Sequence, residues 1–317
     1  MSSPQKEIGG YFGLEQLIDR EYYPDLLKLN SARNALLYLL KARNIHKLYI
    51  PYYLCDTVSA LCDRYGYEYA YYSINKDFMP VFDKELAANE WLYVVNFYGQ
   101  LSNETALGLK AKHGNIIFDN VQAFFQPPVP GIDTIYSCRK FFGVPDGAYL
   151  ATDAVLEEPL PVDISKDRMK HILGRFEGTG SAFYRDFQEN DESFYTLDLR
   201  QMSALTQNVL GAVDYEAVKA KRNANYSMLA EALGSCNGLQ FSQPDGPYCY
   251  PFYCKNGMQI KKALAAKKIY VATLWPNVLD MDVPFERDLA ANILPLPCDQ
   301  RYDVKDMERI IQAIAEI

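Results

Sequence analysis

Several residue patterns are missing from this 317-residue chain, and each absence narrows what the protein can be. No apolar run approaches the ~18–20 residues of a bilayer-spanning helix, and residues 1–10 lack the apolar core of a secretory signal. Histidine occurs three times, and the seven cysteines form no CxxC pair, so neither a zinc site nor a disulfide framework is expected. We therefore expect a cytoplasmic protein with reduced thiols and no metal.

Positive charge is also in deficit. The chain carries 32 Lys and Arg against 40 Asp and Glu, a net charge of −8. A protein that binds nucleic acid or an anionic membrane through its overall field is basic, so neither partner is expected. A local basic pocket for a small anionic ligand remains compatible with this charge. Hydrophobic residues make up 49% of the chain, enough for a large core, and the length predicts two domains.

The N-terminal half alternates strand and helix patterns. Apolar runs and turn residues predict strands at 47–51, 67–73, 92–97, 115–118, 132–136 and 148–152, and helices at 32–43, 55–64 and 103–113. The run at 92–97 is apolar nearly throughout, as in a strand covered on both faces. This alternation predicts an α/β fold built on a mostly parallel sheet with helices on both sides.

The character of the sequence changes after about residue 160. Helical patterns at 163–175, 179–192 and 202–213 are followed by a long helix at 215–233, which ends at a glycine. Beyond it we predict a strand at 248–254, a helix at 257–267, a short strand at 269–272 and a helix at 304–314. The sequence thus predicts a large α/β domain over residues 1–213 and a smaller α+β domain over residues 214–317.

Unusual residues follow three of the predicted strands or turns. Asp119 comes directly after a buried strand, with Gln122 three residues later. Ser137 and Lys140 follow the next strand, and the turn 29–33 leads into the first helix. Ligands of open α/β sheets lie beyond the carboxyl ends of the strands. Taken singly, each residue has an ordinary explanation as a helix cap, a turn former or a solvated charge.

Taken together, these residues match the needs of one cofactor. Pyridoxal phosphate (PLP) requires a lysine amine that holds it as a Schiff base and a carboxylate that faces its ring nitrogen. Its phosphate favours the unpaired N–H groups at a helix N-terminus. The combination therefore predicts a PLP site.

The order of segments resembles the fold type I PLP enzymes, specifically the nucleotide-sugar aminotransferases of the DegT/StrS-like group. The resemblance covers nearly the whole chain, and its most informative pieces are Asp-x-x-Gln and Ser-x-x-Lys. The matching segments are GYFGLE (10–15), NSARNALLYLL (30–40), IPYYLCDTVSA (50–60), VVNFYGQ (94–100), IIFDNVQAFF (116–125), SCRKFFGVPDGAYL (137–150), RQMSALTQNVL (200–210) and ILPLPCDQRYDVKDM (293–307).

This resemblance implies roles for residues around the ring of the cofactor. Lys140 would be the Schiff-base lysine and would shuttle the proton. Asp119 would pair with the pyridinium nitrogen, and Gln122 would approach the phenolic oxygen. The aromatic residue that stacks on the ring in this group falls near Tyr53 or Cys55, and of the two we name Tyr53.

The resemblance also implies a phosphate site and an activity. Ala32 and Arg33 would bind the phosphate through their backbone N–H groups, and Ser137 would add its hydroxyl. The implied activity is that of a homodimeric, PLP-dependent aminotransferase. It would transfer an amino group from an amino acid, with glutamate as the expected donor, to a keto-sugar nucleotide in surface polysaccharide or related biosynthesis.

Two departures from the group keep other reactions open. Two residues separate Ser137 from Lys140, where sugar aminotransferases commonly have four, and the shorter spacing looks more like the cysteine desulfurase branch. Asp198 and Leu199 precede Arg200, where an asparagine of the partner subunit is often seen. The alternatives are another fold type I PLP reaction, such as a lyase or a desulfurase-like reaction, and a non-catalytic binding protein that kept the fold.

Overall fold

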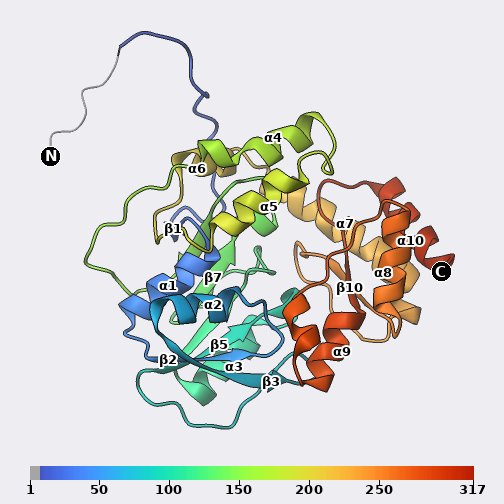
Figure 1. The fold of residues 1–317 in the computed structure, drawn as a ribbon, viewed down its shortest axis with the longest axis horizontal. Helices are drawn as coiled ribbons and strands as arrows, with labels where there is room; N and C mark the ends of the chain where they lie inside the picture. The colour runs from blue at the N-terminus through green and yellow to red at the C-terminus, as the bar shows by residue number, and fades with distance from the viewer. Residues whose placement is uncertain (1–7) are drawn as a thin grey trace.

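The computed structural model describes residues 8–317, and within them the strands form one large sheet and one small sheet (Figure 1). The large sheet has eight strands in the order β1-β8-β7-β6-β5-β2-β3-β4. Its strands are β1 (Leu27–Leu29), β2 (Lys47–Pro51), β3 (Glu68–Ile74), β4 (Pro80–Val81), β5 (Glu90–Val95), β6 (Ile116–Asp119), β7 (Asp133–Ser137) and β8 (Ala148–Ala151). The small sheet pairs β9 (Tyr250–Tyr253) with β10 (Ile293–Leu296) in antiparallel fashion.

The directions of the strands bring three chain segments to one edge of the large sheet. Strands β3, β2, β5, β6 and β7 run parallel to one another. Strand β8 is antiparallel to β7, and β1 is antiparallel to β8, so β1 runs in the same direction as β6 and β7. The carboxyl ends of β1, β6 and β7 therefore share an edge. The mostly parallel α/β sheet predicted from the sequence is confirmed.

The helices begin and end where the local sequence favours it. Serine hydroxyls cap the first turns of three of them, Ser31 for α1, Ser102 for α3 and Ser203 for α6. None of the helices in residues 8–317 is both long and apolar enough to cross a membrane. The helices are α1 (Ala32–Ala42), α2 (Thr57–Tyr65), α3 (Asn103–His113), α4 (Lys170–Glu177), α5 (Tyr184–Ser193), α6 (Ala204–Gly211), α7 (Tyr215–Leu233), α8 (Gly257–Ala266), α9 (Pro284–Asn292) and α10 (Val304–Ala315).

A second hydrophobic core lies in the C-terminal part of the chain, beside the core of the large sheet. Helices α7, α8 and α10 pack with strands β9 and β10 around it, and Figure 1 shows them together on one side of the molecule. The largest aromatic contributions come from Tyr226, Tyr250 and Phe252. The arrangement places α7 between this second core and the segments that follow β7.

Several elements differ from the sequence-based prediction. Residues 269–272, predicted as a strand, pair with no strand of the described chain. Ile269 and Val271 are buried, so the alternating apolar pattern there reflects burial without strand pairing. The prediction did not include β1, β4, β10 or α9. The helices predicted at 163–175, 179–192 and 202–213 are shorter in the structure, where each begins later than predicted; α4 and α5 also end one or two residues beyond the predicted ranges.

Candidate functional site

Asp119 and Lys140 lie at the ends of the adjacent strands β6 and β7. Asp119 is the last residue of β6, and Lys140 ends a 3-10 turn, Cys138–Lys140, that directly follows β7. The charge of Lys140 is close enough to act on the pKa of Asp119. The structure thus brings together the amine and the carboxylate that the sequence singles out.

Asp119 is a buried carboxylate with a fixed orientation. Its side chain is 4% exposed. Oδ2 accepts a hydrogen bond from the hydroxyl of Tyr93 at 2.6 Å, and Oδ1 accepts one from the backbone N–H of Val121 at 2.8 Å. Burial raises the pKa of Asp119, while these two hydrogen bonds and the charge of Lys140 oppose the shift. A cationic group beside it would favour the ionised form.

Gln122 carries a donor that no residue of the described chain satisfies. Its side chain is 1% exposed, and its Oε1 accepts a hydrogen bond from the backbone N–H of Tyr98 at 2.7 Å. Within residues 8–317, its Nε2 is buried and has no hydrogen-bond partner. A buried donor without an acceptor costs free energy, so this amide favours a ligand that brings an acceptor atom.

The side chain of Lys140 is exposed and lies against the ring of Tyr248. Its Nζ is 5.5 Å from the ring centroid, within cation–π distance. Burial raises the pKa of Tyr248, and the positive charges of Lys140 and Arg222 oppose that shift. Tyr248 belongs to the C-terminal part of the chain, so both parts of the molecule contribute to the surroundings of this amine.

The N-terminus of α1 forms the third side of the site. The backbone of Asn30, at the end of β1, ties this terminus to its surroundings: its N–H donates to the carbonyl of Arg200 at 3.0 Å, and its carbonyl accepts from Gly147 at 2.8 Å. Ala32 and Arg33 are the first two helical residues, where backbone N–H groups have no intrahelical acceptor. This end of the helix is therefore suited to an anionic group.

The guanidinium of Arg33 lacks the acceptors that a buried cation needs. Its Nε and Nη1 are buried and have no hydrogen-bond partner in the described chain. The guanidinium lies 4.1 Å from the ring centroid of Tyr195, and burial lowers the pKa of Arg33. The neighbouring Arg139 pairs with Asp191 at 3.0 Å and lies 4.3 Å from the ring centroid of Phe194. Arg33 thus adds a second set of unmatched donors.

The loop around Lys140 is held at its downstream end, and at its upstream end it leaves the Ser137 hydroxyl without a capping role. Ser137, the last residue of β7, does not use its hydroxyl to cap the turn that follows. Downstream, the buried carboxylate of Asp146 accepts hydrogen bonds from the N–H of Ser203 at 2.8 Å, from its hydroxyl at 2.7 Å, and from the hydroxyl of Thr206. These contacts fix the loop against α6.

The structure does not bring Tyr53 to the surface of the site. Its side chain is 0% exposed, and its hydroxyl shares a 2.9 Å hydrogen bond with the hydroxyl of Tyr98. Trp275 and Phe97 pack against its ring, with centroids 4.4 Å and 5.2 Å away. The ring therefore has no free face to offer a cofactor. Cys55, at the other position that the resemblance allows, is half-buried and influences the pKa of Arg33.

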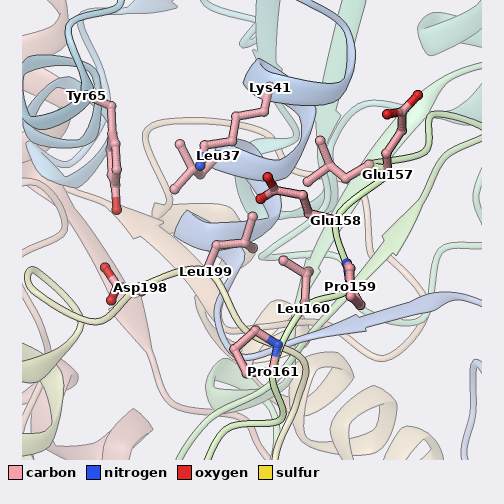
Figure 2. A pocket seen from close by; sticks show the side chains of 11 residues that line it. Leu37, Lys41, Tyr65, Glu157, Glu158, Pro159, Leu160, Pro161, Asp198 and Leu199 are labelled. Atoms are coloured by element: carbon pink, nitrogen blue, oxygen red, sulfur yellow. The ribbon is translucent and has the colours of Figure 1, made fainter. Parts of the chain in front are cut away.

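One pocket of the molecule lies away from these residues. It has a volume of about 380 Å³ and lies between α1, Tyr65 of α2 and the segments 156–161 and 198–199 (Figure 2). Leu37, Lys41, Glu157 and Glu158 are among the side chains that line it. None of the predicted site residues borders it, so we do not assign it to the site.

Sequence reasoning missed three residues that shape the site. Tyr93 lies within the apolar run of β5. Its hydroxyl is a polar group in a buried strand, and the need of that hydroxyl for a hydrogen-bond partner is the one signal that the sequence carries. Tyr248 and Arg222 come from the C-terminal part, and no local pattern links them to Lys140. Their contacts depend on how the second core packs against the large sheet.

Comparisons with known proteins find solved structures that are similar to this one. No protein-family model matches the chain, and no curated protein matches its sequence. A DegT/DnrJ/EryC1/StrS aminotransferase from Brucella abortus matches with a TM-score of 0.64 at 15% identity, over 92% of this chain and 85% of that one. A sugar aminotransferase from Micromonospora echinospora matches with a TM-score of 0.64 at 11% identity, over 92% of this chain and 87% of that one.

A third match, NtdA from Bacillus subtilis with bound cofactor PMP, has a TM-score of 0.66 at 13% identity, over 92% of this chain and 72% of that chain. The TM-scores and the coverage establish the architecture, and at identities of 11–15% they establish the fold alone. The chain has the fold of these aminotransferases, and the predicted fold type I architecture is confirmed.

Proposed function

We propose that this protein is a PLP-dependent aminotransferase that moves an amino group from an amino acid, with glutamate as the expected donor, to a keto-sugar nucleotide. The observation that carries the proposal is that Lys140 and the buried carboxylate of Asp119 lie at the carboxyl ends of adjacent strands, where the charge of the amine acts on the carboxyl group. The architecture shared with structures named as aminotransferases supports it. The sugar acceptor is favoured by the name of one of those structures, a sugar aminotransferase. The nucleotide on that sugar and a role in polysaccharide biosynthesis rest on the sequence resemblance alone.

The residues present fit the cofactor, because their unmatched groups correspond to its polar atoms. The Nε2 of Gln122 is a buried donor without an acceptor in residues 8–317, and it would donate to the phenolic oxygen of the ring. Asp119 would face the ring nitrogen. The hydroxyl of Ser137 and the backbone N–H groups of Ala32 and Arg33 would hold the phosphate, and the orphaned donors of the Arg33 side chain would find acceptors there.

The residues then divide the chemistry between them. When bound, the cofactor supplies a ring that withdraws electrons from the α-carbon of the substrate. The carboxylate of Asp119 would keep a proton on the ring nitrogen, an electrostatic effect that is strongest when negative charge develops on the ring. Nζ of Lys140 would hold the cofactor before the substrate binds. Once the substrate amine has displaced it, the freed Lys140 amine would carry the proton to and from the α-carbon.

We further propose that the protein acts as a homodimer, on the evidence of its N-terminal arm. The arm is anchored to α6, where the N–H of Leu17 donates to Asn208 at 2.8 Å and Asn208 donates to the carbonyl of Glu15 at 2.9 Å. Beyond this anchor it projects away from the molecule (Figure 1). It exposes a set of large apolar side chains, Ile8, Tyr11, Phe12, Leu14 and Ile18. A second copy of the chain would cover them.

The proposal is tested by spectra of the purified protein with added PLP. We expect a visible absorption band that glutamate bleaches, with formation of 2-oxoglutarate, and borohydride should fix the cofactor on Lys140 as mapped by mass spectrometry. Lys140→Ala should abolish the trapping while leaving non-covalent binding of PLP. Trapping on another lysine would contradict the assignment of Lys140.

Other outcomes separate the alternative reactions. A visible band that no amino donor bleaches, with release of sulfide from cysteine, would indicate a desulfurase-like reaction. Cys249 is an unfavourable nucleophile for such a step, because burial raises the pKa of its thiol. A protein that binds no PLP would indicate a non-catalytic role. A panel of keto-sugar nucleotides, assayed for amination with glutamate, tests the acceptor.

A further inference from the structure

The strongest feature outside the predicted site is a buried arginine of the C-terminal part that reaches the loop carrying Lys140. Arg222, on α7, is 1% exposed. Its Nη2 donates to the carbonyl of Phe141 at 3.2 Å, and its Nη1 donates to the carbonyl of Pro247 at 2.8 Å. Phe141 directly follows Lys140, and Pro247 directly precedes Tyr248. The guanidinium of Arg222 is therefore hydrogen-bonded to the residue after Lys140 and to the residue before Tyr248, the two residues that contact each other.

Gln300 is a second donor to the same loop and is hydrogen-bonded to Arg222. Its Nε2 donates to the same carbonyl of Phe141 at 2.7 Å, and its Oε1 accepts a hydrogen bond from Nε of Arg222 at 2.8 Å. The guanidinium also lies 4.5 Å from the ring centroid of Phe141, whose ring is 6.0 Å from that of Tyr248. Three chain segments are thus connected around one peptide carbonyl.

The free energy of this arrangement favours a role other than stability. The hydrogen-bond acceptors of the Arg222 guanidinium, the Gln300 amide and two backbone carbonyls, are all neutral. Burial lowers the pKa of Arg222, and the charge of Asp299 opposes that shift. A buried cation held only by neutral acceptors is costly, and apolar residues of similar size often stabilise a fold more. Methionine would fill this space without the cost, so the guanidinium is better explained by what it positions.

We propose that Arg222 and Gln300 are positioning residues that hold the Lys140 amine against the ring of Tyr248, so that the C-terminal part sets the orientation of the reacting lysine. The inference rests on the proposed function for its chemical meaning. Its geometric content, a fixed Lys140, does not depend on the cofactor. Neither residue contacts the amine itself, and both act through backbone carbonyls.

The test compares Arg222→Met and Gln300→Leu with the wild-type chain and a stability control. The control is Leu229→Ala, because Leu229 lies on α7 with its side chain fully buried in the second core. The rate at which borohydride traps PLP on Lys140 is measured together with the circular dichroism of the visible cofactor band. We expect Arg222→Met to slow trapping by about 10- to 100-fold, since displacements near 1 Å have effects of this size.

The same variant should lose most of the visible circular dichroism, because the cofactor is no longer held in one orientation. Gln300→Leu removes a single donor from the Phe141 carbonyl and should give a smaller change in the same direction. It also keeps the test decisive if Arg222→Met does not fold. Leu229→Ala should lower the melting temperature without changing trapping. Wild-type trapping and dichroism in folded Arg222→Met or Gln300→Leu would overturn the proposal.

A cofactor-free readout separates this inference from the proposed function. If the wild-type chain traps no PLP, the proposed function fails, and the positioning role is then read from acetylation of Lys140 by acetic anhydride. Lys76, an exposed lysine, serves as the internal reference. We expect Arg222→Met to shift the acetylation rate of Lys140 toward that of Lys76. An unchanged ratio between the two lysines would overturn the positioning role by itself.

Discussion

Asp119 combines burial with hydrogen bonds that favour opposite protonation states. Burial raises the pKa of this carboxyl group, and the Tyr93 hydroxyl, the Val121 N–H and the charge of Lys140 oppose the rise without cancelling it. The fold thus disfavours the charged carboxylate relative to the unfolded chain, and a further cation placed beside it would offset this effect. The proposed pyridinium nitrogen is such a cation. The buried carboxyl group therefore lowers the stability of the cofactor-free protein and raises its affinity for the ring.

The first prediction follows from the sign of this shift. Because the pKa of Asp119 is higher in the folded protein than the ordinary value of about 3.9, the unfolded chain loses its proton first. The stability that this group contributes is present below pH ~4 and is lost as pH rises through the folded pKa. Asp119→Asn should therefore melt above the wild-type protein at pH 7 without cofactor, and the two should converge toward pH 4.

Tyr93→Phe is the matched variant, since it removes a donor that stabilises the ionised carboxylate. It should lower the melting temperature at pH 7, opposite to Asp119→Asn. Thermal unfolding followed across this pH range measures both effects. A wild-type protein that is more stable than Asp119→Asn at pH 7 would show that the charge is already compensated without the cofactor. Asp119→Asn should also weaken PLP binding.

Arg33 supports a second prediction, at the phosphate end of the site. Its guanidinium has buried donors without acceptors in residues 8–317, and a bound phosphate would supply them. Charged hydrogen bonds contribute about 1.5–3 kcal/mol, so Arg33→Met should weaken PLP binding by about 10- to 100-fold. Binding of pyridoxal, which lacks the phosphate, should not change. Equal losses for both compounds would exclude a phosphate contact.

Lys41→Met is the control for Arg33, because Lys41 lies on the same helix at its C-terminal end and carries the same charge. It should leave the PLP affinity unchanged. Fluorescence titration with each compound provides the measurement. Loss of affinity in Lys41→Met would attribute the effect to overall charge.

At the scale of the residue, the sequence predicts which residues lie at the ends of the strands better than it predicts which side chains surround them. Asp119, Gln122 and Lys140 follow apolar strands of a parallel sheet, so their meeting at one edge follows from topology. The stacking residue is different, because it depends on which side chain of the 50–60 segment turns toward the edge. Tyr53 turns into an aromatic core. Short-range pattern cannot distinguish an aromatic residue that packs from one that binds.

Elements with strong local signals are the ones that the sequence predicts well. The predicted helices at 103–113 and 215–233 coincide with α3 and α7, which begin at the capping residues Ser102 and Asp214. Strand β1 has only three residues, and its pairing with β8 depends on a segment more than 100 residues away. A strand of three residues is too short to show the alternating apolar pattern from which strands are predicted. The segment 269–272 shows the opposite case, apolar alternation without a pairing partner.

The C-terminal helix offers a prediction at the scale of an element. Helix α10 begins with a capping box, in which the Asp303 carboxylate accepts from the N–H groups of Lys305 and Asp306 at 2.9 Å and 3.2 Å. The Asp306 carboxylate accepts in turn from the N–H of Asp303 at 3.1 Å. Asp303→Ala should lower the free energy of unfolding by about 1 kcal/mol, because both N–H groups lose their acceptor.

Asp303→Asn keeps an oxygen acceptor in the capping position and should lose only a few tenths of that value. Chemical denaturation of both variants gives the comparison. Equal destabilisation by Asn and Ala would indicate that the charge, and its interaction with the helix dipole, matters more than the hydrogen bonds.

At the scale of the whole molecule, the two parts of the chain depend on each other at the site. The large sheet supplies Asp119 and Lys140, while the C-terminal part supplies Tyr248 and the carbonyl contacts of Arg222. The large sheet alone would leave the Lys140 loop without the two donors to the Phe141 carbonyl. The boundary at residue 213 stays a prediction, because Trp275, Val278 and Leu289 from beyond it pack into the core of the large sheet. The site likewise draws on residues from both sides of it.

The last prediction concerns assembly, which rests on the exposed apolar arm. Tyr11 and Phe12 are 97% and 96% exposed, and aromatic side chains of this kind gain ~25 cal/mol per Å² when covered. If a second copy covers them, the double variant Tyr11→Ser, Phe12→Ser should shift the protein from dimer toward monomer. Analytical ultracentrifugation over a range of concentrations measures the dissociation constant.

Val81→Ser and Leu107→Ser, which replace exposed apolar residues of the main body, form the control. Dissociation in the control alone would place the interface elsewhere, and a wild-type monomer at all concentrations would remove the second copy as the partner of the arm.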